Sequence, residues 1–225
     1  MKPTTTWSVD TAVRLEAIFA SYRPFDIRYA ADELICQSGS YAAGIYLVTD
    51  GIAIESYVDR EAEVVPTDLL GAGDLIGFEL LAPDGGPLHC TSCRAVSGVR
   101  LAFLERSAFD AAMDDHPALS AFVTAHLAGR ALRGIRALWR ARLAPSARVQ
   151  DLIPDLSRFG VPTEDGVALP PELDIRLIAD LTALSKRRVK DAIESMPEVA
   201  SRGDRLVIRQ DPRRSCELEG LLDDR

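Results

Sequence analysis

The sequence predicts an α+β protein in which a β-rich N-terminal half is followed by helices, and two observations support this. From about residue 25 to residue 105, short runs of β-branched and aromatic residues alternate with turns that contain Gly or Asp. This spacing is typical of an antiparallel barrel or sandwich. After Pro117, apolar residues recur at helical spacing over a long run. We therefore expect three parts: residues 1–116, a long helix in 117–144, and a last domain in 145–225.

The N-terminal part begins with a predicted amphipathic helix over residues 9–22, in which Val13, Ala17 and Ile18 share a face with Phe19 beside them. The strands that follow include "GIYLV", "IAIESYV" and "VRLAFL". Between the first two, "TDG" at 49–51 predicts a hairpin. A short helix over 106–116 is expected to close this part.

The long helix carries an apolar stripe, which predicts a dimer interface. The stripe residues recur at spacings of four, four and three; they are Leu127, Ala131, Ile135 and Leu138. Arginines decorate the rest of the helix, and we expect a solvated face there for Arg130, Arg133, Arg136, Arg140 and Arg142. His126 is expected to be a partly exposed polar residue rather than a ligand.

The last part predicts a helix-turn-helix with a wing. A helix over about 146–158 and a loop at "FGVPTEDG" precede two helices within 172–196, and "GDRLVIRQD" follows as a hairpin. Ser185 stands where an N-cap belongs, and Val189, Ile193 and Met196 are expected to face inward. The basic residues of "LSKRRVKDAI" then point outward, in the place of a DNA-recognition helix.

The charge distribution agrees with one DNA-binding surface on an acidic chain. The chain has a net charge of −8, which divides into −10 for residues 1–126 and +2 for residues 127–225. A concentrated local field allows a small surface to approach a polyanion even when the whole chain is acidic. The sequence thus predicts DNA contact through the C-terminal part.

This order of parts resembles the Crp/Fnr family of transcription regulators, which are related to the cAMP receptor protein. The resemblance rests on "LICQSGSYAAGIYLVTDGIAIESYV", "LLGAGDLIGFELL" and "LIADLTALSKRRVKDAI", and it covers nearly the whole chain. It implies a cyclic-nucleotide-binding-type β-roll, a long dimerisation helix and a C-terminal winged helix-turn-helix. It also implies a cytoplasmic bacterial homodimer that binds a palindromic operator in double-stranded DNA and works with RNA polymerase.

The resemblance places the effector pocket at Gly77, Phe78, Glu79, Leu80, His89, Cys90 and Thr91. In cAMP-binding members, Gly-Glu-Leu is followed by an Arg-Ser or Arg-Thr pair, and the Arg neutralises the cyclic phosphate. Here Phe78 separates Gly77 from Glu79, and His89 and Cys90 stand in place of the pair. A buried phosphate without a counter-charge is costly. The sequence therefore predicts an effector other than cAMP.

The resemblance places DNA contacts at Ser185, Lys186, Arg187, Arg188, Lys190 and Arg205. Relatives often carry a Glu close to this Ser, where it accepts a hydrogen bond from cytosine, and they have a Gly in the turn. Here Lys186 and Arg187 follow Ser185, and Ala183 occupies the turn. The fold prediction stands, but the family's usual operator sequence does not carry over.

"HCTSC" at 89–93 leaves three readings open: small buried cysteines, a redox or metal site, and haem ligation by His or Cys. If 88–95 is a strand, Cys90 and Cys93 face opposite sides, which is poor geometry for a chelate. The alternatives to an organic effector are therefore a redox-, metal- or haem-dependent gas sensor, and an effector-free member that acts through protein contacts. No enzyme is expected, because no phosphate loop or catalytic constellation is visible. No segment resembles a secretory signal or a membrane span.

Overall fold

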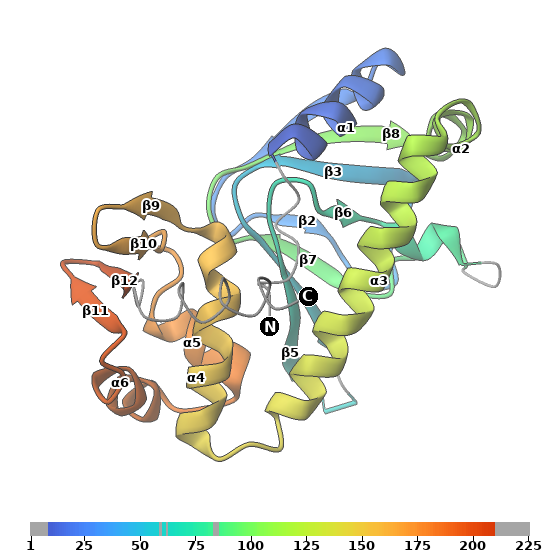
Figure 1. Cartoon of the computed structure of the whole chain (residues 1–225). Coiled ribbons are helices and arrows are strands. Elements are labelled where there is room, and N and C mark those ends of the chain that lie inside the picture. Colours follow the sequence, from blue (N-terminus) through green and yellow to red (C-terminus); the bar gives the residue numbers. More distant parts are fainter. Residues whose placement is uncertain (1–8, 59, 62, 83–85, 210–225) are drawn as a thin grey trace, which may run out of the picture. The chain divides into compact units, whose positions relative to one another are not determined.

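The computed structural model describes residues 9–58, 60–61, 63–82 and 86–209 (Figure 1). The chain divides into two compact units, Met1–Leu138 and Trp139–Arg225. The first unit holds the strands of the predicted barrel, and the second holds the predicted helix-turn-helix. Among the described residues, no helix combines the length and the apolar character that crossing a bilayer requires.

The first unit contains two four-stranded antiparallel sheets. One has the order β1-β8-β3-β6 and the other the order β2-β7-β4-β5. The strands are β1 (Phe25–Tyr29), β2 (Leu34–Cys36), β3 (Gly44–Asp50), β4 (Ala53–Val58), β5 (Val64–Leu70), β6 (Leu75–Ile76), β7 (Ser92–Ala95) and β8 (Val99–Glu105). This is the β-roll that the punctuated β-rich pattern predicts.

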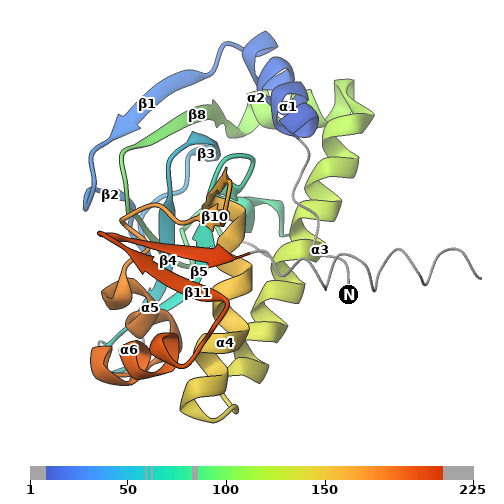
Figure 2. The same ribbon diagram turned by 60° about the vertical axis from the view of Figure 1, so that its left-hand side comes forward.

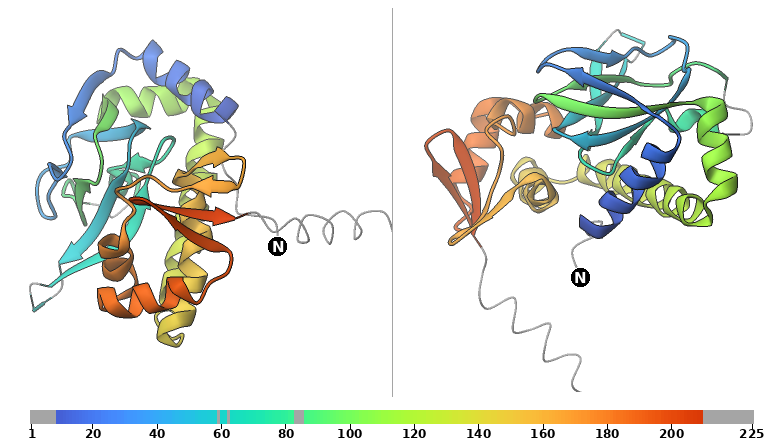
Figure 3. Two further views of the ribbon diagram at one scale, coloured as in Figure 1. Left: turned by 90° about the vertical axis from the view of Figure 1, so that its left-hand side faces the viewer. Right: turned by 90° about the horizontal axis from the view of Figure 1, so that it is seen from above.

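Strand alternation divides the apolar side chains of this unit between two cores. On β3, Val48 is buried between the two sheets, and its neighbour Leu47 is buried against the helices. The helices of this unit are α1 (Val9–Ser21), α2 (Arg106–Asp115), α3 (Pro117–Arg140) and the short 3-10 helix η1 (Phe78–Leu81). Helices α1 and α2 contact β3 and β8, on the side of the sheets where α3 also lies (Figure 3).

The hairpin predicted at residues 49–51 is wrong, because β3 and β4 belong to different sheets. The turn instead carries the chain from one sheet to the other. Gly51 has φ 85°, and a Cβ there would lie 2.0 Å from the carbonyl oxygen of Gly98. The "TDG" signal correctly marks a turn that needs glycine, but it does not identify the partner of each strand.

The first helix forms as predicted, but its inward face is partly different. Leu15 and Phe19 are buried and Ile18 is half-buried, whereas Ala17 is exposed. The side chain of Val13 lies outside the described residues. The larger side chains at i and i+4 occupy the inward face because they bury more apolar surface than alanine does.

In the described part of the second unit, residues 139–209, the α-helices α4, α5 and α6 contact one another and are accompanied by a sheet (Figure 2). Its elements are α4 (Pro145–Leu156), η2 (Ser157–Phe159), β9 (Val161–Thr163), β10 (Gly166–Ala168), α5 (Ile175–Thr182), α6 (Lys186–Glu194), β11 (Val199–Arg202) and β12 (Arg205–Arg209). The sheet order is β11-β12-β10-β9. The prediction that "FGVPTEDG" is only a loop is wrong, because β9 lies within it and pairs with β10.

Candidate functional site

The segment that begins at Gly77 forms a tight turn into η1. Gly77 has φ 91°, and a Cβ there would lie 2.7 Å from the carbonyl oxygen of Gly44. A side chain is therefore excluded by both conformation and space. The turn buries Glu79 and Leu80 and leaves Phe78 half-buried. The sequence-predicted pocket residues of this segment are thus adjacent to the sheet of β3.

His89 and Glu79 form a buried pair. The two atoms His89 Nδ1 and Glu79 Oε1 are 2.5 Å apart, and both side chains are almost fully buried. Hydrogen bonds that His89 donates to Cys36 and then to Glu79 raise the pKa of His89 to about 10. His89 is therefore charged at neutral pH. The pair brings together two predicted pocket residues, and Cys36 is a third member that the sequence did not indicate.

The other predicted pocket residues lie nearer the surface. Cys90 is exposed and Thr91 is half-buried, whereas Cys93 on β7 is fully buried. Cys90 and Cys93 thus differ in environment, but not by strand alternation, because β7 (Ser92–Ala95) begins after Cys90. Among the described residues, no three His, Cys, Asp or Glu side chains are grouped as a metal ion would require.

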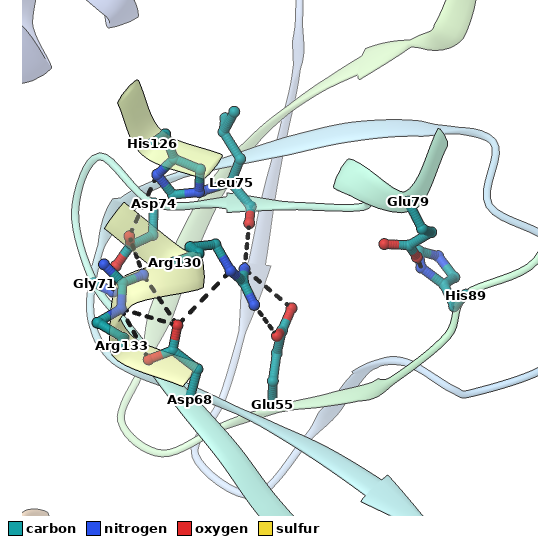
Figure 4. A network of polar contacts seen from close by, with 10 residues as sticks. All are labelled: Glu55, Asp68, Gly71, Asp74, Leu75, Glu79, His89, His126, Arg130 and Arg133. Carbon is teal, nitrogen blue, oxygen red and sulfur yellow. Dashed lines mark hydrogen bonds and ion pairs between the residues drawn. The ribbon is translucent and has the colours of Figure 1, made fainter. Parts of the chain in front are cut away.

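Arg130 of α3 enters the β-roll and binds Glu55 of β4 (Figure 4). It also donates to the carbonyl oxygen of Leu75 at 3.2 Å, and its side chain is only 10% exposed. Burial raises the pKa of Glu55, and the Arg130 charge opposes that shift. The predicted solvated face is therefore wrong for Arg130: the carboxylate on the facing strand compensates its burial.

The network continues along α3 toward the loop before β6. Arg133 donates to both carboxylate oxygens of Asp68 on β5, at 3.1 Å to Oδ1 and at 3.0 and 3.1 Å to Oδ2, and to Asp74 at 3.4 Å (Figure 4). His126 Nε2 accepts from the Leu75 amide at 3.4 Å, and its Nδ1 lies 3.6 Å from Asp74. His126 is buried, so the prediction of a partly exposed residue is wrong.

A cation–π contact joins this network to the predicted pocket. The guanidinium of Arg130 lies 4.3 Å from the centre of the Phe78 ring. Phe78 is the residue inserted between Gly77 and Glu79. The half-buried ring at the start of η1 therefore connects the pocket segment directly to α3.

The predicted stripe of α3 is only partly exposed. Ala131, Ile135 and Leu138 are exposed, whereas Leu127 is half-buried against the helix-side core of its own unit. Two further large apolar side chains, Leu132 and Trp139, are also exposed. The exposed fractions are 54% for Leu132, 62% for Ile135, 73% for Leu138 and 56% for Trp139. Their spacing of three and four places them along one side of the helix.

The end of α3 is held by a second ion-pair group, inside the second unit. Arg140 is buried and donates to Asp151 at 2.7 Å and to Asp155 at 2.6 Å. The predicted solvated face is wrong here as well. Arg142 is exposed as expected.

Two capped helices and a left-handed turn build the predicted helix-turn-helix. The Asp174 carboxylate accepts from the Leu177 amide at 2.9 Å and so caps α5. Ala183 ends α5 with φ 52°, and the Ser185 hydroxyl accepts from the Arg188 amide at 3.4 Å to cap α6. Ala183 supplies the left-handed conformation for which the family uses glycine, at a cost of about 1 kcal/mol.

The basic residues of α6 face solvent while the opposite side of the helix is buried. Val189, Ala192 and Ile193 are buried, as is Met196 just beyond the helix. The exposed basic side chains are Lys186, Arg187, Arg188 and Lys190. Arg205 is exposed at the start of β12, whose hairpin with β11 follows α6. The structure thus places all the predicted DNA contacts on α6, its cap and the adjoining hairpin.

Comparisons with known proteins agree with this architecture. Residues 26–116 match the family described as the cyclic nucleotide-binding domain. No curated protein matches the chain. Solved structures match along most of their length, although their sequence identity is low.

Three of these structures indicate the fold. The c-di-GMP-responsive global regulator CLP of Xanthomonas campestris is 18% identical, with a TM-score of 0.70, over 89% of this chain and 100% of its own. FixK2 from Bradyrhizobium japonicum is 18% identical, with a TM-score of 0.71, over 87% and 96%. A CRP-family transcriptional regulator from Thermus thermophilus is 20% identical, with a TM-score of 0.66, over 82% and 92%. Residues 26–116 are therefore similar to a cyclic nucleotide-binding domain, and the chain as a whole shares its fold with these Crp/Fnr-type structures.

Proposed function

We propose that this protein is a dimeric transcription regulator that binds a palindromic operator in double-stranded DNA through α6. The observation that carries the proposal is the exposed basic side of α6 described above. A capped helix that presents its N-terminal residues to solvent fits the major groove, where side chains reach base edges. Electrostatic attraction to phosphate acts over about one Debye length, roughly 10 Å, so the acidic first half of the chain does not cancel it.

The basic residues have different roles in this proposal. Arg187 lies in the first turn of α6, and its forked guanidinium suits the O6 and N7 acceptors of guanine. Lys190 lies one turn further and pairs with Glu194 at 3.7 Å, with both side chains about two-thirds exposed. Such a pair is weak because water screens it, so Lys190 is available for phosphate. Arg205 on the wing contributes a further phosphate contact.

The exposed apolar side of α3 supports the dimer. A monomer that left Ile135, Leu138 and Trp139 in water would lose the free energy that apolar burial supplies, about 25 cal/mol per Å². Helices with apolar residues at spacings of three and four pack against each other in pairs. A dimer about α3 would present two copies of α6, which a palindromic site requires.

The pocket supports an effector other than cAMP. Glu79 is already bound by His89, and no arginine follows Glu79 within the pocket segment. A cyclic phosphate that entered here would lie beside the negatively charged Glu79 carboxylate, and this segment would offer no arginine to neutralise the phosphate. A ligand that does enter would reach α3 through Phe78 and Arg130, and this contact would shift the population of DNA-competent dimers.

The test is a selection of random duplex DNA, followed by binding titrations at several salt concentrations. Arg187→Ala should cost about 1–3 kcal/mol on the selected site and relax the preference at one base pair per half-site. Lys190→Ala should weaken all duplexes about equally and reduce the salt slope by about one unit. Arg28→Ala is the matched control, because it removes an exposed charge from β1 in the first unit. If neither α6 variant changes affinity for any duplex, the proposal fails.

A further inference from the structure

The structure places Cys93 opposite Cys36 and not beside Cys90, which is its neighbour in the sequence. Cys36 and Cys93 are directly opposed in the antiparallel pair of β2 and β7. Both side chains belong to the apolar core between the two sheets. Cys90, by contrast, is exposed before β7 begins. All three carry free thiols in the structure.

The distances in such a pair suit a disulfide. Opposed residues in antiparallel strands have Cα atoms about 4.5–5.5 Å apart. Disulfides join Cα atoms that are about 4.4–6.8 Å apart. Cys36 is the last residue of the three-residue edge strand β2, and the register is irregular between Leu34 and Cys36. An edge strand of this length can adjust its backbone more easily than a central strand can.

The two sulfurs differ in access and surroundings. Cys36 is 8% exposed and hydrogen-bonds with the charged His89, whereas Cys93 is completely buried. A cation beside a sulfur stabilises the negative charge that the sulfur carries when it attacks an electrophile. Burial raises the pKa of the Cys93 thiol, so Cys93 is the poorer first nucleophile. Cys36 is therefore the residue that an oxidant meets first.

We propose that Cys36 and Cys93 form a reversible disulfide when the protein meets a hydroperoxide. The Cys36 sulfur attacks one peroxide oxygen, the O–O bond breaks, and the other oxygen takes up the Cys36 proton and leaves as water for hydrogen peroxide or as an alcohol for an organic peroxide. The resulting sulfenic acid is attacked by the Cys93 sulfur; the S–S bond forms, the S–O bond breaks, and the Cys93 proton leaves with the hydroxyl as water. Two thiols are oxidised by two electrons, and the peroxide is reduced.

The disulfide acts on the pocket through His89. Its S–S bond would draw the Cys36 sulfur toward Cys93 and away from the imidazole. His89 would then keep Glu79 as its partner but lose the hydrogen bond that contributes most to its raised pKa. We therefore expect the His89 pKa, followed by NMR, to fall on oxidation.

The experiment uses the full chain with Cys90→Ser and Cys216→Ser, so that only the proposed pair remains. Cys216 lies outside the described residues. Hydrogen peroxide should remove both titratable thiols and yield a Cys36–Cys93 cross-linked peptide about 2 Da lighter than the two reduced peptides, and dithiothreitol should restore both thiols. Two thiols that stay free, or a Cys36 that goes to sulfinic acid without cross-linking, would overturn the proposal.

Two variants extend the test. With Cys93→Ser added, a sulfenic-acid trap should label Cys36, because the second thiol is missing. With His89→Gln added instead, disulfide formation should slow by about tenfold, because the cation beside Cys36 is gone. A Cys36 that stays unlabelled in the Cys93→Ser variant would overturn its assignment as the first nucleophile. The mapping on the two-cysteine chain remains decisive if either added variant fails to fold.

Discussion

Replacing Arg130 by methionine tests whether the ion pair inside the β-roll is needed to hold α3. The substitution keeps an unbranched apolar stem and leaves Glu55, which is 2% exposed, without its counter-charge. Glu55 can lose its charge by taking up a proton. For a carboxyl with the ordinary pKa of 4.5, protonation at neutral pH costs about 3 kcal/mol. Loss of the contact with Phe78 adds about 1 kcal/mol. We therefore expect the substitution to lower the free energy of unfolding by about 3–4 kcal/mol.

The pH dependence of this loss has a definite sign. A carboxyl whose pKa is raised in the folded state contributes stability that is complete below its unfolded pKa and is lost as the pH rises through the folded value. The deficit of Arg130→Met relative to wild type should therefore shrink to about 1–2 kcal/mol near pH 5. Urea unfolding followed by circular dichroism at both pH values measures it.

Two controls make the result decisive. Arg142→Met removes an exposed arginine and should change the free energy of unfolding by less than about 0.5 kcal/mol. The double variant Glu55→Leu with Arg130→Met should recover most of the loss, because a pair of apolar side chains replaces the buried ions. A loss below about 1 kcal/mol for Arg130→Met, or one that does not change with pH, would refute the reasoning.

The other predictions concern the turn, the apolar face and the pocket. Ala183→Gly should stabilise the chain by about 1 kcal/mol in urea unfolding, because glycine adopts φ 52° without strain. Ile135→Glu should dissociate the proposed dimer in light scattering, whereas Ala20→Glu, at an exposed alanine of α1, adds the same charge and should not. Because the His89 pKa is raised from 6.5 to about 10, its stabilisation is complete below about pH 6.5 and is lost toward pH 10; His89→Gln should flatten that decline. Calorimetry with millimolar cAMP should give no saturable heat, and micromolar binding would show that the pocket has been misinterpreted.

The sequence was sufficient for the order of the main parts, because that order depends on local patterns. The 3.6-residue period predicts α3, the Ser185 cap predicts the start of α6, and the spacing of β-branched runs predicts the β-roll. The same local patterns do not predict which elements pair with each other. The turn at Gly51 is correctly located, but the partners of β3 and β4 depend on the packing of two sheets.

In the candidate site, too, the sequence reveals features that lie within one segment and misses contacts between distant segments. The glycine turn and the run of basic residues in α6 can be found in the sequence, since each is one short segment. Arg130 could not be assigned, because its partner Glu55 lies 75 residues away on a facing strand. The opposition of Cys36 and Cys93 likewise depends on strand register, whereas their spacing in the sequence favours Cys90 with Cys93.

A hydroxyl-radical footprint on the selected duplex tests the central claim most directly, because it reports DNA contact and dimer geometry together. Two copies of α6 held by α3 should protect two segments on one face of the duplex, with their centres about one helical turn, roughly 10 base pairs, apart. Arg187→Ala should lose both segments at the concentration where the wild type protects them. A single protected segment would contradict the dimer, and a uniform cleavage pattern at saturating protein would contradict the assignment of α6 as the DNA-binding element.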